Sequence, residues 1–532
     1  MNNLVDSEFK GSGSIAVKRE LYGHPVGLFI LFFTEMWERF SYYGMRALLV
    51  LYLIGEVSGK NPGLGWTSAE AGELYGWYTM LVYITPIIGG ILADKIFGFR
   101  KAILIGGVLM TLGHLSLAFH PMPAFYLGLG LLIIGNGFFK PNISSIVGQL
   151  YPEGSKRKDS GYTIFYQGIN VGAFLGSILC GYLGETMGWH YGFGLAGIFM
   201  FIGLIQFKLS QQIFGEIGLA PKDGNLKENV DLKDSVDNLK DKSLTKVERD
   251  RLIIVGVLCF FSIFFWAAFE QAGTSMNIFA SKYTDRQLVD STAITLFKVI
   301  SSFLSCLPVA ILTWMYLGMQ RKIGKDFPLA MMFMLLSVVL LWGLIGYMVY
   351  RQYFDPNPEV PATWFQSLNA LFIFTLAPLF SWLWTFLAKT SFNPNGLQKF
   401  AIGLLLLGIG FIPMVIGATG ITGDSTIKVS MVFLVLAYLL HTMGELSLSP
   451  VGLSYVNKLS PKRLLGLMFG IWFFASAMGN KIAGSFSTYM EKIAETSSMS
   501  DFFQILVMIP IGGGIFLFLI SFPLKKLMHG IE

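Results

Sequence analysis

Ionisable residues lie inside an apolar segment near the start of the chain. Glu35, Glu38 and Arg39 fall within five residues, and apolar stretches flank them on both sides. Each charge at bilayer depth costs roughly 2.5–3.5 kcal/mol on insertion scales. We therefore expect these side chains to face a protein interior or a watery cavity, paired with one another or with a substrate. A carboxylate in such a pocket can gain or lose a proton as its partner moves.

The spacing of this cluster predicts one helix face. Relative to the first residue, the pattern i, i+3, i+4, i+7 and i+11 is occupied by Glu35, Glu38, Arg39, Tyr42 and Arg46. Such a face would gather two carboxylates and a guanidinium in one polar pocket. The alternative is a static buried salt-bridge cluster that only fixes helix packing.

Further charges occur in apolar segments downstream, at Lys140, Glu270 and Glu445. Positive charges in the first half and carboxylates in the second predict a site with two electrostatic ends. Arg39 and Lys140 would hold a carboxylate, and Glu445 would hold an ammonium group, so a zwitterion of modest length would satisfy both ends. For Lys140 alone, the alternative is a lysine that reaches back to the membrane interface.

The composition indicates a membrane protein. Of the 532 residues, 53% are hydrophobic and 14% are charged, which is about half the charged fraction of a soluble domain. The net charge of +6 does not indicate a nucleic-acid partner, because the basic residues lie in short connections between apolar runs. Cys180, Cys259 and Cys306 lack the spacing of metal ligands, so we expect no metal site.

Fourteen apolar segments are long enough to cross a bilayer, which takes about 20 residues. They predict an all-α polytopic membrane protein with two six-helix bundles and an extra two-helix hairpin, a duplicated plan of transporter type. The segments lie at about 25–55, 69–97, 101–120, 123–150, 161–187, 190–209, 251–281, 291–318, 326–350, 362–388, 399–419, 428–457, 464–487 and 502–524.

Basic residues gather in alternate connections, such as Lys156 to Lys158 and Lys525 with Lys526. The positive-inside rule then places both termini in the cytoplasm. The polar stretch before the seventh segment is expected to be a solvated, partly disordered linker. The domains are expected to be a cytoplasmic tail at 1–24, an N-terminal bundle at 25–209, a cytoplasmic linker at 210–250, and a C-terminal bundle at 251–532.

The connection between the second and third segments carries a fairly specific motif. It runs from Gly89 to Lys101 and includes Leu92-Ala93-Asp94, then Gly98 and Arg100. Asp94 is expected to lie at a helix end beside basic residues, where it would pin neighbouring helices in one conformational state. The alternative is an ordinary basic turn. The motif resembles the loop motif of the major facilitator superfamily.

With that motif, the Glu35–Gly44 run resembles the signature of the proton-dependent oligopeptide transporter family. Four other segments are similar to that family's motifs, and together the resemblance covers nearly the whole chain. These segments are Phe165–Gly172, Phe265–Gln271, Trp364–Asn369 and Gly444–Gly452. The resemblance implies the fold of the major facilitator superfamily and import of di- and tripeptides with protons, by alternating access of two six-helix bundles.

The resemblance also implies roles for single residues. Proton coupling would involve Glu35, Glu38 and Glu270. The peptide carboxylate would lie near Arg39 and Lys140, and the peptide amino terminus near Glu445. The peptide backbone and side chains would contact Asn170, Asn369, Ser449, Tyr43, Tyr83, Trp266 and Trp472. Gating would involve Asp94, Arg100 and Tyr42. For Tyr83 the neighbouring Tyr78 is an alternative, and for each aromatic residue the alternative is lipid contact or core packing.

One feature departs from the family pattern. In familiar bacterial members the extra hairpin lies between the two six-helix halves, whereas the distance from Glu270 to Asn369 places it here at about 291–350, inside the second half. We expect it to pack peripherally.

Other functions remain open at this point. The same fold and coupling could serve another solute, such as nitrate or a peptide-like drug, although a simple anion would not need Glu445. A membrane-embedded enzyme would need a nucleophile–base pair or a metal cluster, and the sequence shows no such motif. A channel is disfavoured by the glutamate–arginine pairing. We therefore expect a transporter of the bacterial inner membrane that needs no cofactor beyond the proton gradient and for which a monomer is sufficient.

Overall fold

Long helices account for most of the chain. The computed structural model describes residues 14–152, 154–220, 244–391, 393–423 and 425–531. Within them, thirteen helices are long and apolar enough to cross a membrane. The helix α2 (Val26–Ile54) is also 29 residues long and carries the charges that exclude it from that set. With α2 the helices number fourteen, so the predicted fold class is confirmed.

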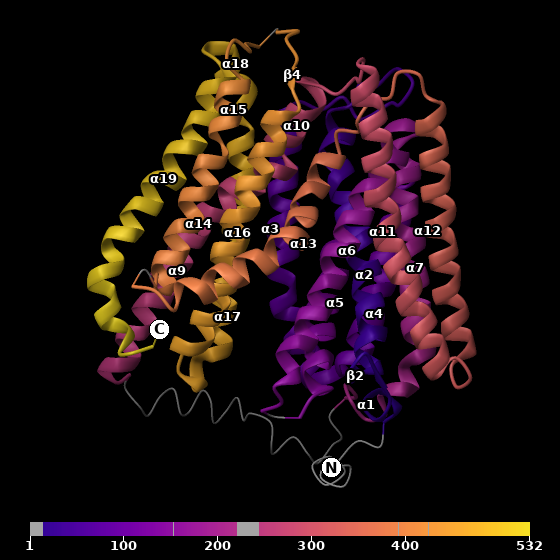
Figure 1. The fold of residues 1–532 in the computed structure, drawn as a ribbon, viewed down its shortest axis with the longest axis vertical. Coiled ribbons are helices and arrows are strands. Elements are labelled where there is room, and N and C mark those ends of the chain that lie inside the picture. The colour runs from indigo at the N-terminus through magenta and orange to yellow at the C-terminus, as the bar shows by residue number, and fades with distance from the viewer. Residues whose placement is uncertain (1–13, 153, 221–243, 392, 424, 532) are drawn as a thin grey trace.

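The helices form two groups that stand side by side (Figure 1). We call the end that carries α1 and β2 in Figure 1 the lower end and the opposite end the upper end. The first-half helices are α2, α3 (Ser68–Leu92), α4 (Phe99–Leu117), α5 (Met122–Gln149), α6 (Arg157–Thr186) and α7 (Trp189–Ser210). The second-half helices are α9 (Lys246–Phe269), α10 (Ser275–Lys282), α13 (Trp364–Leu387), α14 (Gly396–Gly410), α15 (Ile412–Gly417), α16 (Val432–Leu459), α17 (Leu465–Ser487), α18 (Tyr489–Thr496) and α19 (Met499–Leu524).

Short elements complete the described residues. They are α1 (Ile15–Lys18), the paired strands β1 (Glu20–Leu21) and β2 (His24–Pro25), the paired strands β3 (Thr284–Asp285) and β4 (Val429–Ser430), the π-helical turn η1 (Ala93–Phe97), and the 3-10 turns η2 (Gln211–Phe214), η3 (Glu270–Gly273), η4 (Lys462–Leu464) and η5 (Lys525–Met528). The expected linker at 210–250 thus begins with η2 and ends inside α9, and its central part, 221–243, lies outside the described residues.

Capping residues in the sequence explain where several helices begin. Thr67 and Glu70 form a reciprocal capping box at the start of α3, and Thr245 and Glu248 do the same for α9. Each box satisfies two backbone N–H groups that the first turn leaves without partners. These polar signals fix the helix ends, while the apolar runs between them fix the spans.

The helix α2 lies in the interior of the first half. All its residues except Tyr43 and Ile54 are buried, and it packs along α6 and α7. Its glycine at position 44 allows close approach to α6, because an added Cβ would lie 2.6 Å from the sulfur of Cys180. The charges of α2 are therefore surrounded by protein rather than by lipid, as their cost predicts.

The hairpin of α11 (Ser291–Ile323) and α12 (Pro328–Phe354) stands at the right edge of Figure 1. In sequence it interrupts the second half, yet α12 packs on α7 and α6 of the first half. The hairpin also contacts the residues that follow α1, where Arg19 pairs with Asp326 and the ring of Tyr22 stacks on Trp314 at 4.2 Å between centroids. The hairpin is thus attached to the first-half helices.

Candidate functional site

The predicted charge cluster of α2 forms two separate ion-pair sites. In the first, Arg39 pairs with both Glu35, at 3.0 Å from Nε to Oε1, and Glu38. The three side chains are at most 4% exposed. Within the described residues, the Nη2 atom of Arg39 is buried and has no hydrogen-bond partner. A buried donor without a partner destabilises the protein unless a ligand accepts a hydrogen bond from it.

Two residues of α5 extend this first site. Asn136 donates a hydrogen bond to Oε1 of Glu38 at 3.1 Å. One helical turn further along α5, the ammonium group of Lys140 lies 4.6 Å from the ring centroid of Tyr83 on α3. Lys140 therefore points toward α3, inside the first half, and adds a positive charge on the same side as Arg39.

The second ion-pair site joins the two halves. Arg46, two turns beyond Arg39 on α2, pairs with Glu270 and donates to the hydroxyl of Tyr75 at 2.5 Å. The sequence predicts Glu270 inside a continuous span, but the helix breaks there: α9 ends at Phe269 and the 3-10 turn η3 begins at Glu270. Discontinuous membrane helices commonly form binding sites, because their broken ends present polar groups at membrane depth.

A carboxylate of the second half is held in place by an amide. Asn369 on α13 donates to Oε2 of Glu445 on α16 at 2.8 Å and to the hydroxyl of Thr442 at 3.2 Å. Asn369 and Glu445 are both predicted site residues, and the structure brings them into contact. Within the described residues no ion pair involves Glu445, so its carboxylate is oriented but not neutralised.

The other predicted contact residues differ in their surroundings. Tyr43 lies against Tyr42 and within 5.8 Å of the guanidinium carbon of Arg46. Trp266 and Ser449 each have a buried polar atom with no hydrogen-bond partner among the described residues. Both therefore retain the capacity to bond a ligand.

Three further residues lie in packed or self-bonded positions. Trp472 is 4% exposed and packs against Gly452, where an added Cβ would meet its ring at 2.3 Å. The side chain of Asn170 donates to the carbonyl of Tyr166 in its own helix at 3.1 Å. The alternative to Tyr83, Tyr78, is 2% exposed and its hydroxyl has no partner among the described residues.

The predicted gating residues Asp94 and Arg100 lie at the lower end. Asp94 falls in the π-helical turn η1 and is exposed. Arg100 instead donates to the carbonyls of Ile217 and Gly215, each at 2.5 Å. Arg100 therefore holds the segment that follows α7 against the start of α4. The third residue predicted to take part in gating, Tyr42, is buried beside Arg39, with the guanidinium carbon 5.6 Å from its ring centroid.

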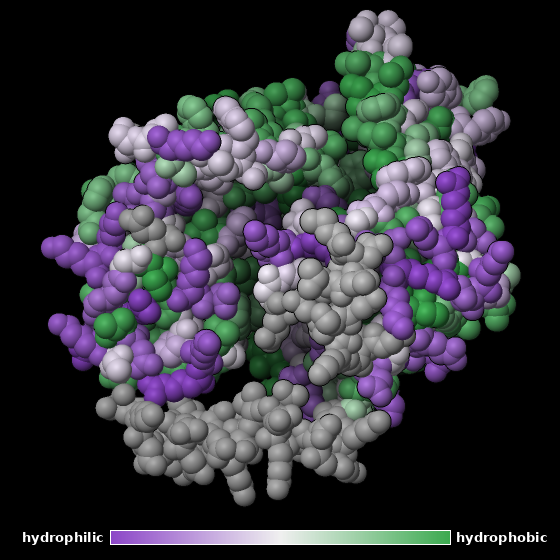
Figure 2. Space-filling view, turned by 60° about the horizontal axis from the view of Figure 1, so that its bottom comes forward, coloured by the Kyte–Doolittle hydropathy of each residue, from purple (hydrophilic) through white to green (hydrophobic). Residues whose placement is uncertain are grey.

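Contacts between the halves close the upper end. The hydroxyl of Ser68 on α3 donates to Glu491 on α18 at 2.6 Å, and Glu73 on α3 pairs with Lys481 on α17. At the opposite end the surface is hollowed between the two groups of helices (Figure 2). The conformation is therefore closed at the upper end and open at the lower end.

A second contact at the upper end joins α6 to the start of α13. The carboxylate of Glu185 accepts hydrogen bonds from the backbone N–H groups of Ala362 and Thr363, both at 2.9 Å, and from the hydroxyl of Thr363 at 2.7 Å. Arg286 lies 3.6 Å from the same carboxylate. We call these four residues the α6–α13 clasp.

Comparison with known proteins identifies the family. The family described as the POT family matches residues 100–232 and 329–505. An uncharacterized transporter, YclF of Bacillus subtilis, is 36% identical, with 97% of each chain covered. The chain belongs to the POT family. The predicted resemblance to proton-dependent oligopeptide transporters is thereby confirmed.

Two relatives of this POT-family chain have been named for what they transport. The di-/tripeptide transporter of Lactococcus lactis subsp. cremoris is 32% identical, covering 97% of this chain and 99% of that protein. A crystal structure of the peptide transporter POT in complex with sulfate is 31% identical, with a TM-score of 0.75, covering 97% of this chain and 98% of that one. The similarity extends over nearly the full length of the chain.

The sequence did not predict two contacts that are present in the structure of this protein. The sequence places Arg46 on the charged face of α2, but it does not predict the pairing of Arg46 with Glu270. The i+7 spacing from Arg39 was the available signal, because it places a second guanidinium on the same face. The contacts of Glu185 could not be predicted, because a single glutamate at the end of a span is typical of an ordinary residue at the membrane interface.

Proposed function

We propose that this chain is a proton-driven symporter that imports di- and tripeptides by alternating access of its two halves. The observation that carries the proposal is the polarity of the site. Arg39 and Lys140 supply positive charge from the first half, and Glu445 supplies negative charge from the second. A peptide with free termini carries the complementary charges at its two ends, so it would bridge the halves.

The carboxylate end of the peptide would bind at Arg39 and Lys140. The buried Nη2 atom of Arg39 has no hydrogen-bond partner among the described residues, and a carboxylate oxygen would complete it. The amino end would bind Glu445, which Asn369 already orients. The remaining contacts are proposed for Asn170, Ser449, Tyr43, Tyr83, Trp266 and Trp472.

Proton coupling is assigned to Glu35, Glu38 and Glu270. Each of these carboxylates neutralises a buried arginine. Protonation of Glu270 would remove the charge that holds Arg46 and so loosen α2 from η3, a contact between the halves. An energised membrane can drive such a cycle, because its potential supplies about 2.3 kcal/mol per 100 mV for each charge that crosses, in addition to the proton gradient. Transport should therefore rise as external pH falls.

The proposal includes the setting of the protein. The positive-inside pattern supports an inner-membrane location with both termini in the cytoplasm, so the lower end would be cytoplasmic. Asp94, Arg100 and Tyr42 would then stabilise one of the alternating states. No cofactor beyond the proton gradient is invoked, and one chain holds both ends of the proposed site.

The decisive experiment is uptake of radiolabelled dialanine into proteoliposomes, with and without an inward proton gradient. We expect gradient-dependent accumulation that Glu445→Ala abolishes. Unlabelled dialanine should compete in the wild type, whereas N-acetylated dialanine, which has no ammonium group, should compete poorly. Equal competition by the two peptides would remove the role of Glu445. No accumulation by folded protein would overturn the peptide assignment and favour another solute.

A further inference from the structure

Asn136 lies on α5 in a position that tight packing holds in place. A Cβ added at Gly135 would lie 2.8 Å from a backbone carbonyl oxygen of α4, and one added at Gly137 would lie 2.7 Å from the side chain of Thr85 on α3. Because α5 packs closely against both helices, the backbone at Asn136 has little freedom to shift. The residue is 1% exposed, and its side chain reaches Glu38 on α2.

One polar atom of the Asn136 side chain has a partner and the other has none. The amide nitrogen Nδ2 donates to Oε1 of Glu38 at 3.1 Å, whereas the amide oxygen Oδ1 is buried and accepts no hydrogen bond from the described residues. The nitrogen faces Glu38 because an ionised carboxylate can only accept hydrogen bonds. A buried acceptor without a partner destabilises the protein, so we expect Oδ1 to gain a partner in another state of the site.

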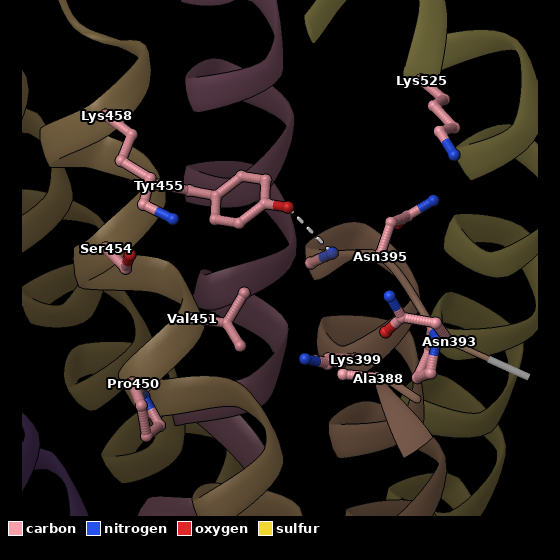
Figure 3. Close-up of a pocket in the computed structure, with 12 residues that line it drawn as sticks. Ala388, Asn393, Asn395, Lys399, Pro450, Val451, Ser454, Tyr455, Lys458 and Lys525 are labelled. Carbon is pink, nitrogen blue, oxygen red and sulfur yellow. Dashed lines mark hydrogen bonds between the residues drawn. The ribbon is translucent and has the colours of Figure 1, made fainter. Parts of the chain in front are cut away.

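Other asparagines differ from Asn136, because their side chains bond to the backbone. Asn142 on α5 is also 1% exposed and donates to the carbonyl of Phe138 in its own helix at 2.7 Å. Asn395 accepts from the backbone N–H of Gln398 at 3.0 Å and so caps α14, beside the cavity shown in Figure 3. These bonds stabilise single helices, whereas Asn136 bonds a group that can change its charge.

The cations around Glu38 favour only one of its protonation states. Among the described residues, the charged or titratable side chains that interact with it are Glu35 and Arg39 on α2, Lys140 on α5 and Tyr78 on α3. Arg39 and Lys140 carry positive charge and only donors, so they stabilise the ionised carboxylate. A protonated Glu38 has an O–H group that needs an acceptor, and neither cation can supply one.

We propose that Asn136 is a positioning residue that hydrogen-bonds Glu38 in both of its protonation states. The amide donates from Nδ2 to the ionised carboxylate, and after a half-turn about its terminal torsion it accepts from the protonated carboxyl group at Oδ1. Asn136 thereby reduces the free-energy cost of changing the charge of Glu38 inside the protein and helps to set the pH at which this change occurs. The inference rests on the proposed role of Glu38 in proton coupling.

The test follows the proton on Glu38 in the purified full-length protein, without transport. Infrared spectra recorded in detergent over a range of pH contain the carbonyl-stretching band of protonated carboxyl groups, and the part of the band that Glu38→Gln removes reports on Glu38. Asn136→Leu keeps the shape of the side chain but has no polar atom. We expect it to raise the midpoint pH of this band by about half a unit to one unit, because a hydrogen bond to a charged group is stronger than one to a neutral group.

A matched control separates this bond from a general disturbance of α5. Asn142→Leu removes an equally buried amide from the same helix and should leave the midpoint unchanged. An equal shift in both variants would overturn the inference, as would an unchanged midpoint in Asn136→Leu. A shift in Tyr78→Phe but not in Asn136→Leu would also overturn it and assign the acceptor to the Tyr78 hydroxyl. If Asn136→Leu does not fold, Asn136→Ala replaces it. A smaller rise is then expected, because water can enter the space, and an unchanged midpoint again overturns the inference.

Dialanine uptake by the wild type is measured in parallel, so that this inference and the proposed function can fail separately. Accumulation of dialanine together with a Glu38 band that does not titrate would overturn the inference and leave the symporter assignment in place. A midpoint that shifts as expected in Asn136→Leu, without dialanine accumulation by the wild type, would support the inference and overturn the peptide assignment.

Discussion

At the scale of single residues, the pair of Arg46 and Glu270 has the most direct test. Glu270→Gln keeps a hydrogen-bond acceptor for Arg46 but carries no charge that depends on a proton. We expect gradient-driven dialanine uptake to fall to background, while exchange of internal for external dialanine at equal pH persists in part. Unfolding should be easier, by less than the roughly 3–5 kcal/mol of a fully broken buried pair. Proteoliposome uptake and exchange measure the first effect, and thermal unfolding the second.

The control for this prediction is another glutamate–arginine pair. Glu20 contacts Arg157 at 2.7 Å, and both side chains are nearly half exposed. Exposed pairs contribute about 0–1 kcal/mol, so Glu20→Gln should leave uptake, exchange and stability almost unchanged. Equal loss of uptake and exchange in Glu270→Gln would assign Glu270 a binding role instead of a coupling role.

Residue types alone predict much of this site. Buried charges at Glu35, Arg39 and Glu445 are too costly to lie in lipid, so their presence in apolar runs indicates a pocket. The partners are harder to predict, because pairing depends on which helices are neighbours. Thus the contact of Asn369 with Glu445 joins residues of α13 and α16, and no spacing rule connects residues that far apart in sequence.

At the scale of elements, the α6–α13 clasp is expected to stabilise the closed upper end. Glu185→Gln removes the charge that attracts Arg286 and leaves a single acceptor oxygen, so one of the two backbone N–H groups, of Ala362 or Thr363, loses its partner. We expect the upper end to open more often. Spin labels at the exposed positions Val57 and Tyr489 should then show a larger share of long distances. The same labels with Glu495→Gln, an exposed carboxylate, are the control, and an unchanged distribution in Glu185→Gln would contradict the role.

The close packing of α3 on α17 is expected to be necessary for closure of the upper end. A Cβ added at Gly484 would lie 2.4 Å from the Cα of Gly76, and a backbone atom cannot yield as a flexible side chain can. Gly484→Leu should therefore keep the upper end from closing and reduce dialanine uptake strongly. Gly512→Leu on α19, where an added Cβ meets nothing within 4 Å, is the control. Normal uptake by Gly484→Leu would show that closure does not need this contact.

The position of a break within a membrane-spanning helix could not be predicted from the sequence. The run around Glu270 is apolar and contains no proline, so it reads as one continuous span. The structure instead turns at η3, where Gly273 lies against Tyr75 so closely that an added Cβ would meet its hydroxyl at 1.9 Å. Packing between the halves, a long-range effect, therefore decides where this helix is interrupted.

At the scale of the whole molecule, the hairpin is expected to move with the first half. Tyr347 on α12 and Met187 after α6 are in contact, with 3.9 Å between the hydroxyl and the sulfur. With Cys180, Cys259 and Cys306 replaced, a flexible thiol cross-link between Tyr347→Cys and Met187→Cys should leave dialanine uptake intact. A cross-link between Ser68→Cys and Glu491→Cys, which joins the halves, should stop it. Arrest by the first cross-link would show that the hairpin moves against the first half.

The hairpin shows the limit of sequence reasoning at this scale. The position of the hairpin in the chain follows from the number of residues between Glu270 and Asn369. The helices against which the hairpin packs do not follow from the sequence. Proximity in sequence favours the second half, whereas the structure packs α12 on α7. Both helices are apolar on most sides, so periodicity gives no direction for their packing.

This attachment also has a consequence for biogenesis. The ribosome completes α7 roughly 120 residues before it begins α12, which at 5–20 residues per second is an interval of about 6–24 s. Throughout that time the surface of α7 that later receives α12 faces lipid or the insertion machinery. That surface must therefore be compatible first with lipid or the insertion machinery and later with α12. A polar substitution on it would impair membrane insertion before it could affect transport.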